Sequence, residues 1–352
     1  MDEKTVVILG ATGSIGTQTL DVINKLNSYK VVGIVFGKNK LLGEKIIKQY
    51  SIKYYFSKRL SNVSSITELL EKTRPDIVIS AIPGFYGVVT SFEAAKHTKR
   101  IALANKEALV CAGPFFKKEC EKNNVELIPV DSEHSAIFQI FGKNVEKILI
   151  TASGGAVRNY KNIENLTPSD ILNHPVWNMG QKITVDSSTM VNKAFEVIEA
   201  YELFEVDNIE VLIHPTGTVH GAVFYKDGVV KIHFGFPDMK IPISYALTYP
   251  NRCYTYSKWP KFSSKNFIFE KVDEKKYPAF FYGKKLINNL AKRIAFNAAD
   301  EIAVEKFLQG KIKFHEISKI IINTCEKIDG NVRDLNDIFE LDKLARKIAN
   351  NF

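Results

Sequence analysis

Apolar runs of strand length alternate with amphipathic segments along the first 130 residues of the chain. The runs cover residues 5–9, 31–36, 76–82, 100–104 and 125–130. Continuous apolar runs are typical of strands that are buried on both faces of a sheet. A helical pattern follows the first run, beginning with Leu20, Val22 and Ile23. Strands that alternate with helices predict an α/β fold with a doubly wound parallel sheet over residues 1–130.

The pattern changes after residue 130. Residues 145–151 predict another strand, and residues 210–214, 222–226 and 229–234 predict a mainly antiparallel sheet, with Asp227-Gly228 as a hairpin turn. Residues 251–280 are irregular, with Pro260, Pro278 and paired serines at 263–264, which is typical of a linker. From residue 281 to 352 apolar residues recur every three or four positions. We therefore predict a central α+β catalytic domain over 131–250 and a supporting C-terminal helical bundle over 281–352.

A glycine-rich turn joins the first predicted strand to its helix. Its sequence, residues 10–16, is Gly-Ala-Thr-Gly-Ser-Ile-Gly. Glycines allow a tight turn and a close backbone approach, and the helix N-terminus presents free N–H groups to a pyrophosphate. The motif predicts a Rossmann-like dinucleotide-binding domain, and a purely structural glycine turn is the alternative.

The end of the second predicted strand indicates which dinucleotide binds. In domains that bind NAD, an acidic residue at this position contacts the ribose hydroxyls. This chain instead has Gly37-Lys38-Asn39-Lys40. A basic loop suits the additional 2′-phosphate, so we predict a preference for NADPH. A solvated lysine loop is the alternative interpretation.

Residues 174–196 carry the most informative polar cluster. A loop containing Trp177 runs into Ser187 and Ser188, and a helical pattern then places Asn192, Lys193 and Glu196 on one face. Hydroxyls, an amide, an ammonium and a carboxylate together suit a phosphate held beside a metal ion. A solvated helix face after a loop is the alternative.

Three carboxylates form a candidate metal site. Asp131 and Glu133 point the same way if their segment is extended, and Glu196 is the third ligand. Oxygen ligands favour Mg²⁺ or Mn²⁺, and the sequence offers no His/Cys cluster for zinc. Two neighbouring acids on an ordinary surface are the alternative for Asp131 and Glu133.

Further residues are weaker candidates for substrate binding. Ser153-Gly154-Gly155 at a predicted strand end suits an anion nest or a plain turn. His174, His214 and His220 are candidates for substrate contact or for a structural role, and His174 is favoured because it opens the Trp177 loop. Trp177 and Met179 suit a lid over the substrate, and an exposed loop fixed by one buried tryptophan is the alternative.

Composition narrows the classes of partner. The 352 residues are 45% hydrophobic and 25% charged, with a net charge of +9. The lysines are spread along the chain without a nucleic-acid recognition motif, so the charge fits anionic small molecules better than nucleic acid. The four cysteines show no disulfide or zinc spacing, and we expect neither a membrane span nor a signal peptide. A cytoplasmic location is therefore expected.

Together these motifs resemble the 1-deoxy-D-xylulose 5-phosphate reductoisomerase family. The matching segments are GATGSIG (10–16), GKN (37–39), LANKE (103–107), DSEH (131–134), ASGG (152–155), HPxWxMGxK (174–182), VDSSTMxNKxxE (185–196), PDM (237–239), PNR (250–252) and FNAADEIAVEKFL (296–308). Val176, Asn178 and Gln181 depart from the lid residues expected for the family.

The resemblance implies a role for each candidate residue. It makes Asp131, Glu133 and Glu196 the metal ligands and assigns catalysis to these three with Lys106 and His174. Substrate binding falls to Lys106, Ser132, Glu133, Ser153, His174, Trp177, Ser187, Asn192, Lys193 and Glu196. NADPH binding falls to Thr12, Gly13, Ser14, Ile15, Gly37, Lys38, Asn39, Asn105, Glu107, Met179 and Gly180. A homodimer is also implied.

The implied reaction has two stages. The carbon skeleton of 1-deoxy-D-xylulose 5-phosphate rearranges with a divalent metal as Lewis acid, and NADPH then reduces the branched aldehyde to 2-C-methyl-D-erythritol 4-phosphate. Two other functions remain open at this point. They are another NADP-linked, metal-dependent dehydrogenase of a small phosphorylated or carboxylated substrate, and a non-catalytic dinucleotide-binding module.

Overall fold

The structure, a computed structural model, describes residues 3–173, 176–177, 179–256, 259–264 and 267–352. By internal packing the chain divides into two compact units. The first contains residues 1–108, 114–135 and 238–257, and the second contains residues 109–113, 136–237 and 258–352. These boundaries differ from the predicted domain boundaries, and the division into three domains stays a prediction.

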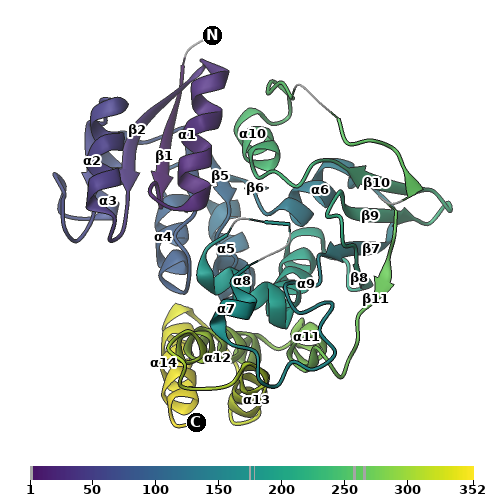
Figure 1. Ribbon diagram of the computed structural model, residues 1–352. Helices are drawn as coiled ribbons and strands as arrows, with labels where there is room; N and C mark the ends of the chain where they lie inside the picture. The colour runs from purple at the N-terminus through teal and green to yellow at the C-terminus, as the bar shows by residue number, and fades with distance from the viewer. Residues whose placement is uncertain (1–2, 174–175, 178, 257–258, 265–266) are drawn as a thin grey trace. The chain divides into compact units, whose positions relative to one another are not determined.

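The first unit is built on a parallel sheet of six strands in the order β3-β2-β1-β4-β5-β6 (Figure 1). The strands are β1 (Lys4–Leu9), β2 (Tyr29–Val35), β3 (Tyr54–Phe56), β4 (Ile77–Ser80), β5 (Arg100–Leu103) and β6 (Glu126–Pro129). Residues Val6 to Leu9 are fully buried, as a strand covered on both faces requires. The strand order reverses between β1 and β4, which confirms the doubly wound sheet and marks its ligand-binding edge.

Helices connect these strands. They are α1 (Ser14–Leu26), α2 (Lys40–Gln49), α3 (Ile66–Thr73), α4 (Tyr86–Ala95), α5 (Glu107–Lys122) and α6 (Ser132–Ile140). A later helix, α10 (Lys240–Thr248), also belongs to this unit. The Arg100 guanidinium on β5 donates to the Leu247 carbonyl at 3.0 Å, and Lys240 pairs with Asp21 of α1 at 2.8 Å. Residues 238–257 therefore return to the first sheet.

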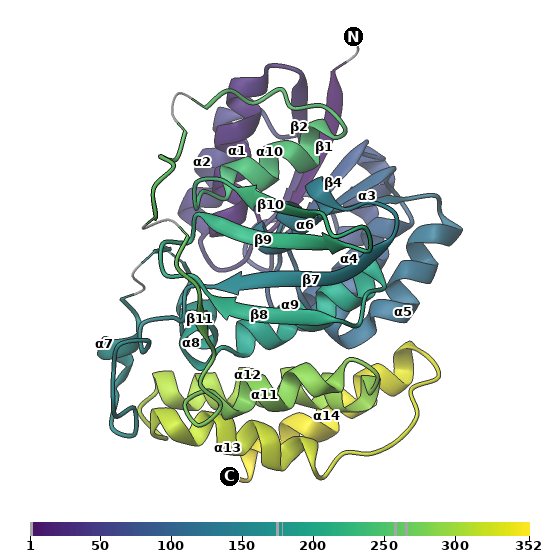
Figure 2. The same ribbon diagram turned by 90° about the vertical axis from the view of Figure 1, so that its right-hand side faces the viewer.

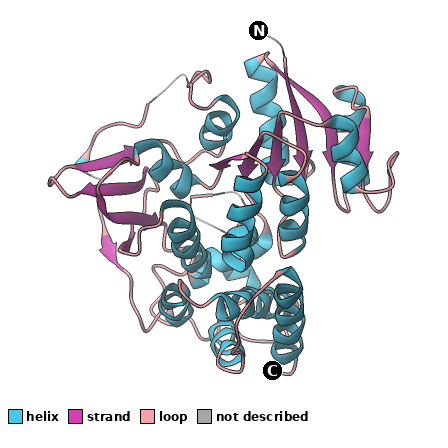
Figure 3. Cartoon of the chain, turned by 180° about the vertical axis from the view of Figure 1, so that it is seen from behind, coloured by secondary structure: helices cyan, strands magenta, loops and turns pink. Residues whose placement is uncertain are grey.

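The second unit contains a mixed sheet in the order β10-β9-β7-β8-β11. Its strands are β7 (Val145–Ala152), β8 (Ile209–Ile213), β9 (Val219–Tyr225), β10 (Val230–Phe234) and β11 (Glu270–Lys271). Among the described strands of this second sheet only β7 and β8 pair in parallel, which confirms a mainly antiparallel sheet. Asp227 and Gly228 lie in the turn between β9 and β10. Figure 3 shows the strands of the chain in two groups.

One expectation about the linker is wrong in part. Glu270 and Lys271 pair with β8, and Glu270 also accepts two hydrogen bonds from Arg158. The sequence pattern of residues 251–280 gave no sign of this short strand, because a strand of two residues has no measurable period. That segment therefore contributes an edge to the second sheet.

Helices complete the second unit. They are α7 (Pro168–Ile171), α8 (Gln181–Thr189), α9 (Val191–Phe204), α11 (Pro278–Gly283), the 3₁₀ turn η2 (Lys284–Leu286), α12 (Leu290–Leu308), α13 (Phe314–Cys325) and α14 (Leu335–Asn350). The last three helices pack on one another and form a layer of their own, which confirms the helical bundle (Figure 2). No helix of the described residues is long and apolar enough to cross a membrane.

The polar loop at 181–189 was predicted wrongly. Ser187 and Ser188 lie in the last turn of α8, not in a loop. The helix ends at Met190, whose φ of 57° is left-handed, and α9 begins at the next residue. Several β-branched and hydroxyl residues weaken the helical signal of α8, so packing against neighbouring helices decides its structure.

Candidate active site

The first turns of α9 present the predicted polar cluster in a buried setting. The Asn192 amide donates to Glu196 Oε1 at 2.6 Å, and Lys193 Nζ donates to Glu196 Oε2 at 2.5 Å. Lys193 is 6% exposed and Glu196 is 1% exposed. The interpretation as a solvated helix face is therefore wrong. Asn192 Oδ1 is buried without a hydrogen-bond partner among the described residues, so an acceptor remains at this site.

The loop after β7 packs against the C-terminal end of α8. Gly154 and Gly155 have φ angles of +83° and +65°. A Cβ on Gly155 would lie 2.5 Å from the Ser188 Cα and 2.6 Å from the Ser187 carbonyl oxygen. The Ala156 N–H donates to Ser188 Oγ at 3.2 Å, and the Gly155 N–H faces Ser153 Oγ at the same distance. Two predicted phosphate ligands, Ser153 and Ser187, thus lie on segments in close contact.

In the first unit, Lys106 and Asp131 form a close ion pair. Lys106 Nζ lies 2.5 Å from Asp131 Oδ2, and His134 Nδ1 lies 3.2 Å from Asp131 Oδ1. Both acidic candidates here follow β6, at the carboxyl edge of the sheet. The expected extended conformation is wrong, because Glu133 lies in the first turn of α6 with Ser132 at its start. Ser132 Oγ donates to Glu133 Oε2 at 2.8 Å.

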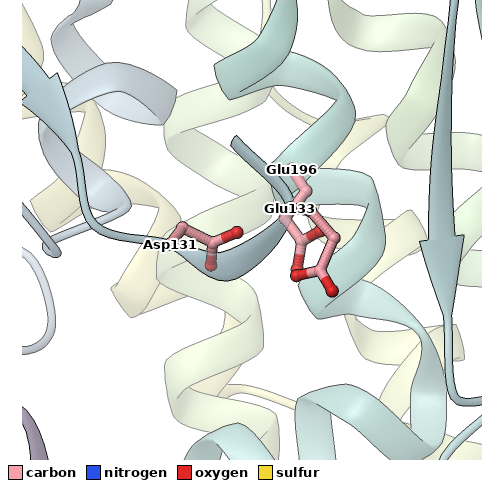
Figure 4. Close-up of side chains that lie close together, drawn as sticks. All are labelled: Asp131, Glu133 and Glu196. Carbon is pink, nitrogen blue, oxygen red and sulfur yellow. The ribbon is translucent and has the colours of Figure 1, made fainter. Parts of the chain in front are cut away.

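The three predicted metal ligands come together. One carboxylate oxygen from each of Asp131, Glu133 and Glu196 lies within 4.8 Å of the other two (Figure 4). Asp131 and Glu133 are half-buried, and Glu196 is buried. Carboxylates this close repel one another unless cations compensate them, and Lys106 and Lys193 each contact one of the three.

The glycine turn has the geometry that the sequence predicted. Gly10 has a φ of +98°, and a Cβ there would lie 2.6 Å from the Ala81 carbonyl oxygen. Gly13 precedes α1, whose N-terminus has no side-chain cap and no acidic residue in its first turn. Ser14 and Ile15 begin that helix, and Thr12 lies in the turn. Free N–H groups therefore remain available for an anion.

The loop after β2 is exposed and basic. Gly37, Lys38 and Asn39 are all exposed. Asn39 Oδ1 accepts from the Leu42 N–H at 3.1 Å and so caps α2. The Arg59 guanidinium lies 3.5 Å from the Lys38 carbonyl oxygen, which adds a second cation beside Lys38. The sequence pattern gave no signal for Arg59, because it lies in an irregular segment.

Asn105 and Glu107 shape the loop after β4. The Asn105 amide donates to the carbonyl oxygens of Ile82 and Gly84 at 2.9 and 3.2 Å and to Glu107 at 2.5 Å. Glu107 accepts from the Gly84 N–H at 3.1 Å. Both side chains are buried. Their visible contribution is to fix the loop at the carboxyl end of the sheet.

The described candidate histidines and lid residues differ in how far they are buried. His174 and Asn178 lie outside the described residues. Trp177, Met179 and the departure Val176 are half-buried, and Gly180 precedes α8. His220 is buried, with Nε2 3.3 Å from the Phe236 carbonyl oxygen.

His214 has a structural setting. It is fully buried, and its ring stacks on Phe269 with centroids 5.0 Å apart. Its Nδ1 donates to the Ile268 carbonyl at 2.9 Å, so Nε2 accepts from the hydroxyl of Thr216, also at 2.9 Å. Burial lowers the pKa of His214 below its usual 6.5, and the Ile268 carbonyl only partly opposes this effect.

We expect His214 to make stability fall at acidic pH. The folded pKa is below the unfolded value of 6.5, so the unfolded chain takes up a proton that the folded chain resists. This contribution is complete above the unfolded pKa and is lost as the pH falls below it. Urea unfolding from pH 8 to pH 5 measures the effect, and H214Q should show a shallower loss than the wild type. The control H315Q should retain the wild-type slope; equal slopes for H214Q and the wild type would contradict the assignment.

Comparison with known proteins places the chain in a family. Residues 127–204 match the C-terminal domain of 1-deoxy-D-xylulose 5-phosphate reductoisomerase, residues 234–348 match a second C-terminal domain of DXP reductoisomerase, and residues 6–74 and 57–113 match 1-deoxy-D-xylulose 5-phosphate reductoisomerase. The reductoisomerase of Pseudothermotoga lettingae is 48% identical over 99% of this chain and 98% of its own length. The chain belongs to the 1-deoxy-D-xylulose 5-phosphate reductoisomerase family. The reductoisomerase of Thermotoga maritima is 49% identical over 99% of this chain and 98% of its own length.

Solved reductoisomerases have the same fold. A DOX-P reductoisomerase in complex with NADPH, fosmidomycin and magnesium superposes with a TM-score of 0.92 at 32% identity, covering 99% of this chain and 98% of the other. The Zymomonas mobilis reductoisomerase in complex with NADPH gives 0.90 at 34% identity, covering 99% of both chains. The predicted family and fold class are confirmed.

Proposed function

We propose that this protein converts 1-deoxy-D-xylulose 5-phosphate to 2-C-methyl-D-erythritol 4-phosphate with NADPH and Mg²⁺ or Mn²⁺, in the non-mevalonate isoprenoid pathway. The observation that carries this proposal is the carboxylate cluster of Asp131, Glu133 and Glu196 in a chain of the reductoisomerase family. A plain dinucleotide-binding module has no need for such a cluster. No observation favours another NADP-linked dehydrogenase.

The carboxylate cluster fits a small divalent cation. Mg²⁺ and Mn²⁺ prefer oxygen ligands, and Asp131, Glu133 and Glu196 each offer one carboxylate oxygen within 4.8 Å of the other two. When bound, the cation supplies Lewis-acid polarisation of the substrate oxygens. The ion pairs of Lys106 with Asp131 and of Lys193 with Glu196 would hold these two carboxylates in position as ligands.

The polar groups around α8 and α9 suit the substrate phosphate. We assign this role to Ser153, Ser187, Asn192 and Lys193 together with His174. Hydroxyls, an amide and a buried ammonium all donate hydrogen bonds to phosphate oxygens. The phosphate is remote from the reacting carbons, so its binding energy positions them without entering the chemistry. Lys106 and Ser132 are assigned to the sugar hydroxyls, with Trp177 as the covering side chain.

NADPH is assigned to the edge of the first sheet. The free N-terminus of α1, at Gly13, Ser14 and Ile15, faces the pyrophosphate in this assignment. Lys38 lies at the end of β2, where the 2′-phosphate distinguishes NADPH from NADH. Met179 and Gly180 are assigned to the cofactor as well.

Consumption of NADPH with 1-deoxy-D-xylulose 5-phosphate tests this function. We expect the loss of NADPH absorbance to require added Mg²⁺ or Mn²⁺ and to stop with EDTA. The branched polyol phosphate should be the product by mass spectrometry. Folded protein that binds NADPH but does not consume it with this substrate and metal would refute the proposal.

We further propose a homodimer, which the family resemblance implies, and we place its interface along β10 from the exposure of that strand. This strand lies at an edge of the second sheet, and Val230 and Ile232 point to one face with exposed fractions of 44% and 48%. Exposed apolar side chains on an edge strand favour pairing with another chain. A cytoplasmic location also fits, because all four cysteines are free thiols.

I232E is expected to convert the dimer to a monomer, because it places a charge in the proposed interface. Sedimentation velocity at several concentrations measures the change. The control L344E alters an equally exposed leucine on α14, at 47%, and should remain dimeric. A wild-type monomer, or an I232E dimer of unchanged affinity, would contradict this interface.

A further inference from the structure

A cluster of one lysine and two buried carboxyls joins α8 to the C-terminal helices. Lys182, in the first turn of α8, donates to Asp186 Oδ2 at 2.6 Å and to Asp300 Oδ2 of α12 at 2.5 Å. Asp186 is 3% exposed and Asp300 is fully buried. Burying two neighbouring carboxyls is costly unless a cation compensates them, and Lys182, with a side chain 30% exposed, is that cation. The contact between Lys182 and Asp300 therefore ties α8 to α12 by charge as well as by packing.

Aromatic contacts brace the same junction. Lys182 Nζ lies 5.6 Å from the ring centroid of Phe195 on α9. Phe195 in turn meets Phe296 of α12 edge-on, with centroids 5.5 Å apart. One lysine and two phenylalanines thus connect α8, α9 and α12, all within the second unit.

Lys182 is the shared partner of the two carboxyls. Its ammonium donates to Oδ2 of Asp186 and to Oδ2 of Asp300, so one cation lies opposite both acidic groups. Burial raises the pKa of Asp300, and the neighbouring Glu301 carboxylate adds to this effect, while Lys182 opposes it. Loss of the Asp300 carboxyl therefore removes the part of this contact that lies on α12.

The position of α8 depends on this junction. The helix has nine residues and no side-chain cap at Gly180, so contacts with neighbouring helices must hold it. Its other end packs on the loop that carries Ser153, through Gly155 and Ser188. A movement of α8 therefore displaces the Ser187 hydroxyl relative to Ser153.

We propose that Asp300 is a positioning residue for substrate binding: it holds Lys182, and thereby fixes α8 and the Ser187 hydroxyl against the loop of Ser153. The inference rests on the proposed function, which assigns both serines to the substrate phosphate. It gives the C-terminal helical bundle a role in substrate affinity, where the sequence indicated support alone.

Two variants at Asp300 and one at Lys182 test this role. D300A removes the acceptor of Lys182 that lies on α12 and leaves only Asp186, on α8 itself. It should raise the KM for 1-deoxy-D-xylulose 5-phosphate about tenfold, because a displaced binding group weakens every contact to the phosphate. The kcat and the KM for NADPH should stay within about twofold. D300N keeps a carbonyl oxygen that can accept from Lys182 in a side chain of the same shape, so it should restore the KM to within about twofold of the wild type. K182M keeps the apolar stem against Phe195 and should behave like D300A.

Controls separate this inference from the proposed function. E305A alters an exposed carboxylate on the same helix and should match the wild type. S187A should raise the KM for the substrate and the inhibition constant of inorganic phosphate, measured as a competitor of the substrate. If S187A has these effects while folded D300A and K182M do not, the positioning role is wrong and the proposed function stands.

Other outcomes also decide the question. If D300A does not fold, an unchanged KM in K182M refutes the role by itself. If D300N is impaired as strongly as D300A, an acceptor for Lys182 at position 300 does not fix α8, and the positioning role is wrong. If the wild-type protein does not turn over the substrate, or S187A leaves its KM unchanged, the phosphate assignment fails and the inference fails with it.

Discussion

E133Q is expected to lower kcat about 1000-fold while the protein remains folded and binds NADPH, since the metal provides several kcal/mol of transition-state stabilisation. Glu133 is half-buried and accepts a hydrogen bond from Ser132, which the glutamine carbonyl can also accept. The substitution therefore removes a charge from the carboxylate cluster with little change in shape. Steady-state kinetics measures kcat, and calorimetric titration with Mn²⁺ measures metal affinity directly.

A matched control makes the result for E133Q specific. E121Q removes an exposed carboxylate on α5 and should leave both kcat and metal affinity unchanged. Turnover of E133Q within tenfold of the wild type, or undiminished Mn²⁺ binding, would remove Glu133 from the metal site. Loss of NADPH binding by E133Q would indicate a wider structural change instead.

G16A is expected to weaken NADPH binding about 100-fold and to lower the free energy of unfolding by about 1–3 kcal/mol. The added methyl group would lie 2.4 Å from the Gly10 carbonyl oxygen and 2.6 Å from the Ala11 Cα. Both are backbone atoms, so the glycine turn must open to admit the methyl group. The opened turn no longer presents the N-terminus of α1 to the pyrophosphate.

Fluorescence titration with NADPH and urea unfolding measure the two effects of G16A. The control G235A places its methyl group 3.4 Å from a carbon of the His233 ring, an ordinary contact, and should change neither quantity. Unchanged NADPH affinity in a destabilised G16A protein would mean that the pyrophosphate does not bind at this turn.

Features that depend on residues close together along the chain could be predicted from the sequence alone. Runs such as Val6–Leu9 indicated buried parallel strands because both faces of such strands are apolar. The spacing of Gly10, Gly13 and Gly16 indicated the turn before α1, and helical spacing placed Asn192, Lys193 and Glu196 on one face of α9. These patterns are local, and local conformation follows from local sterics and periodicity.

Contacts between side chains that are far apart in the sequence could be seen only in the tertiary structure. Glu133 reaches the carboxylate cluster from a helix, not from the extended segment that the spacing suggested. Ser187 and Ser188 lie in a helix because α9 and α12 pack against it. Lys182 meets Asp300 across 118 residues of sequence. A buried charge is tolerated only where another segment supplies its partner, and no local pattern records that partner.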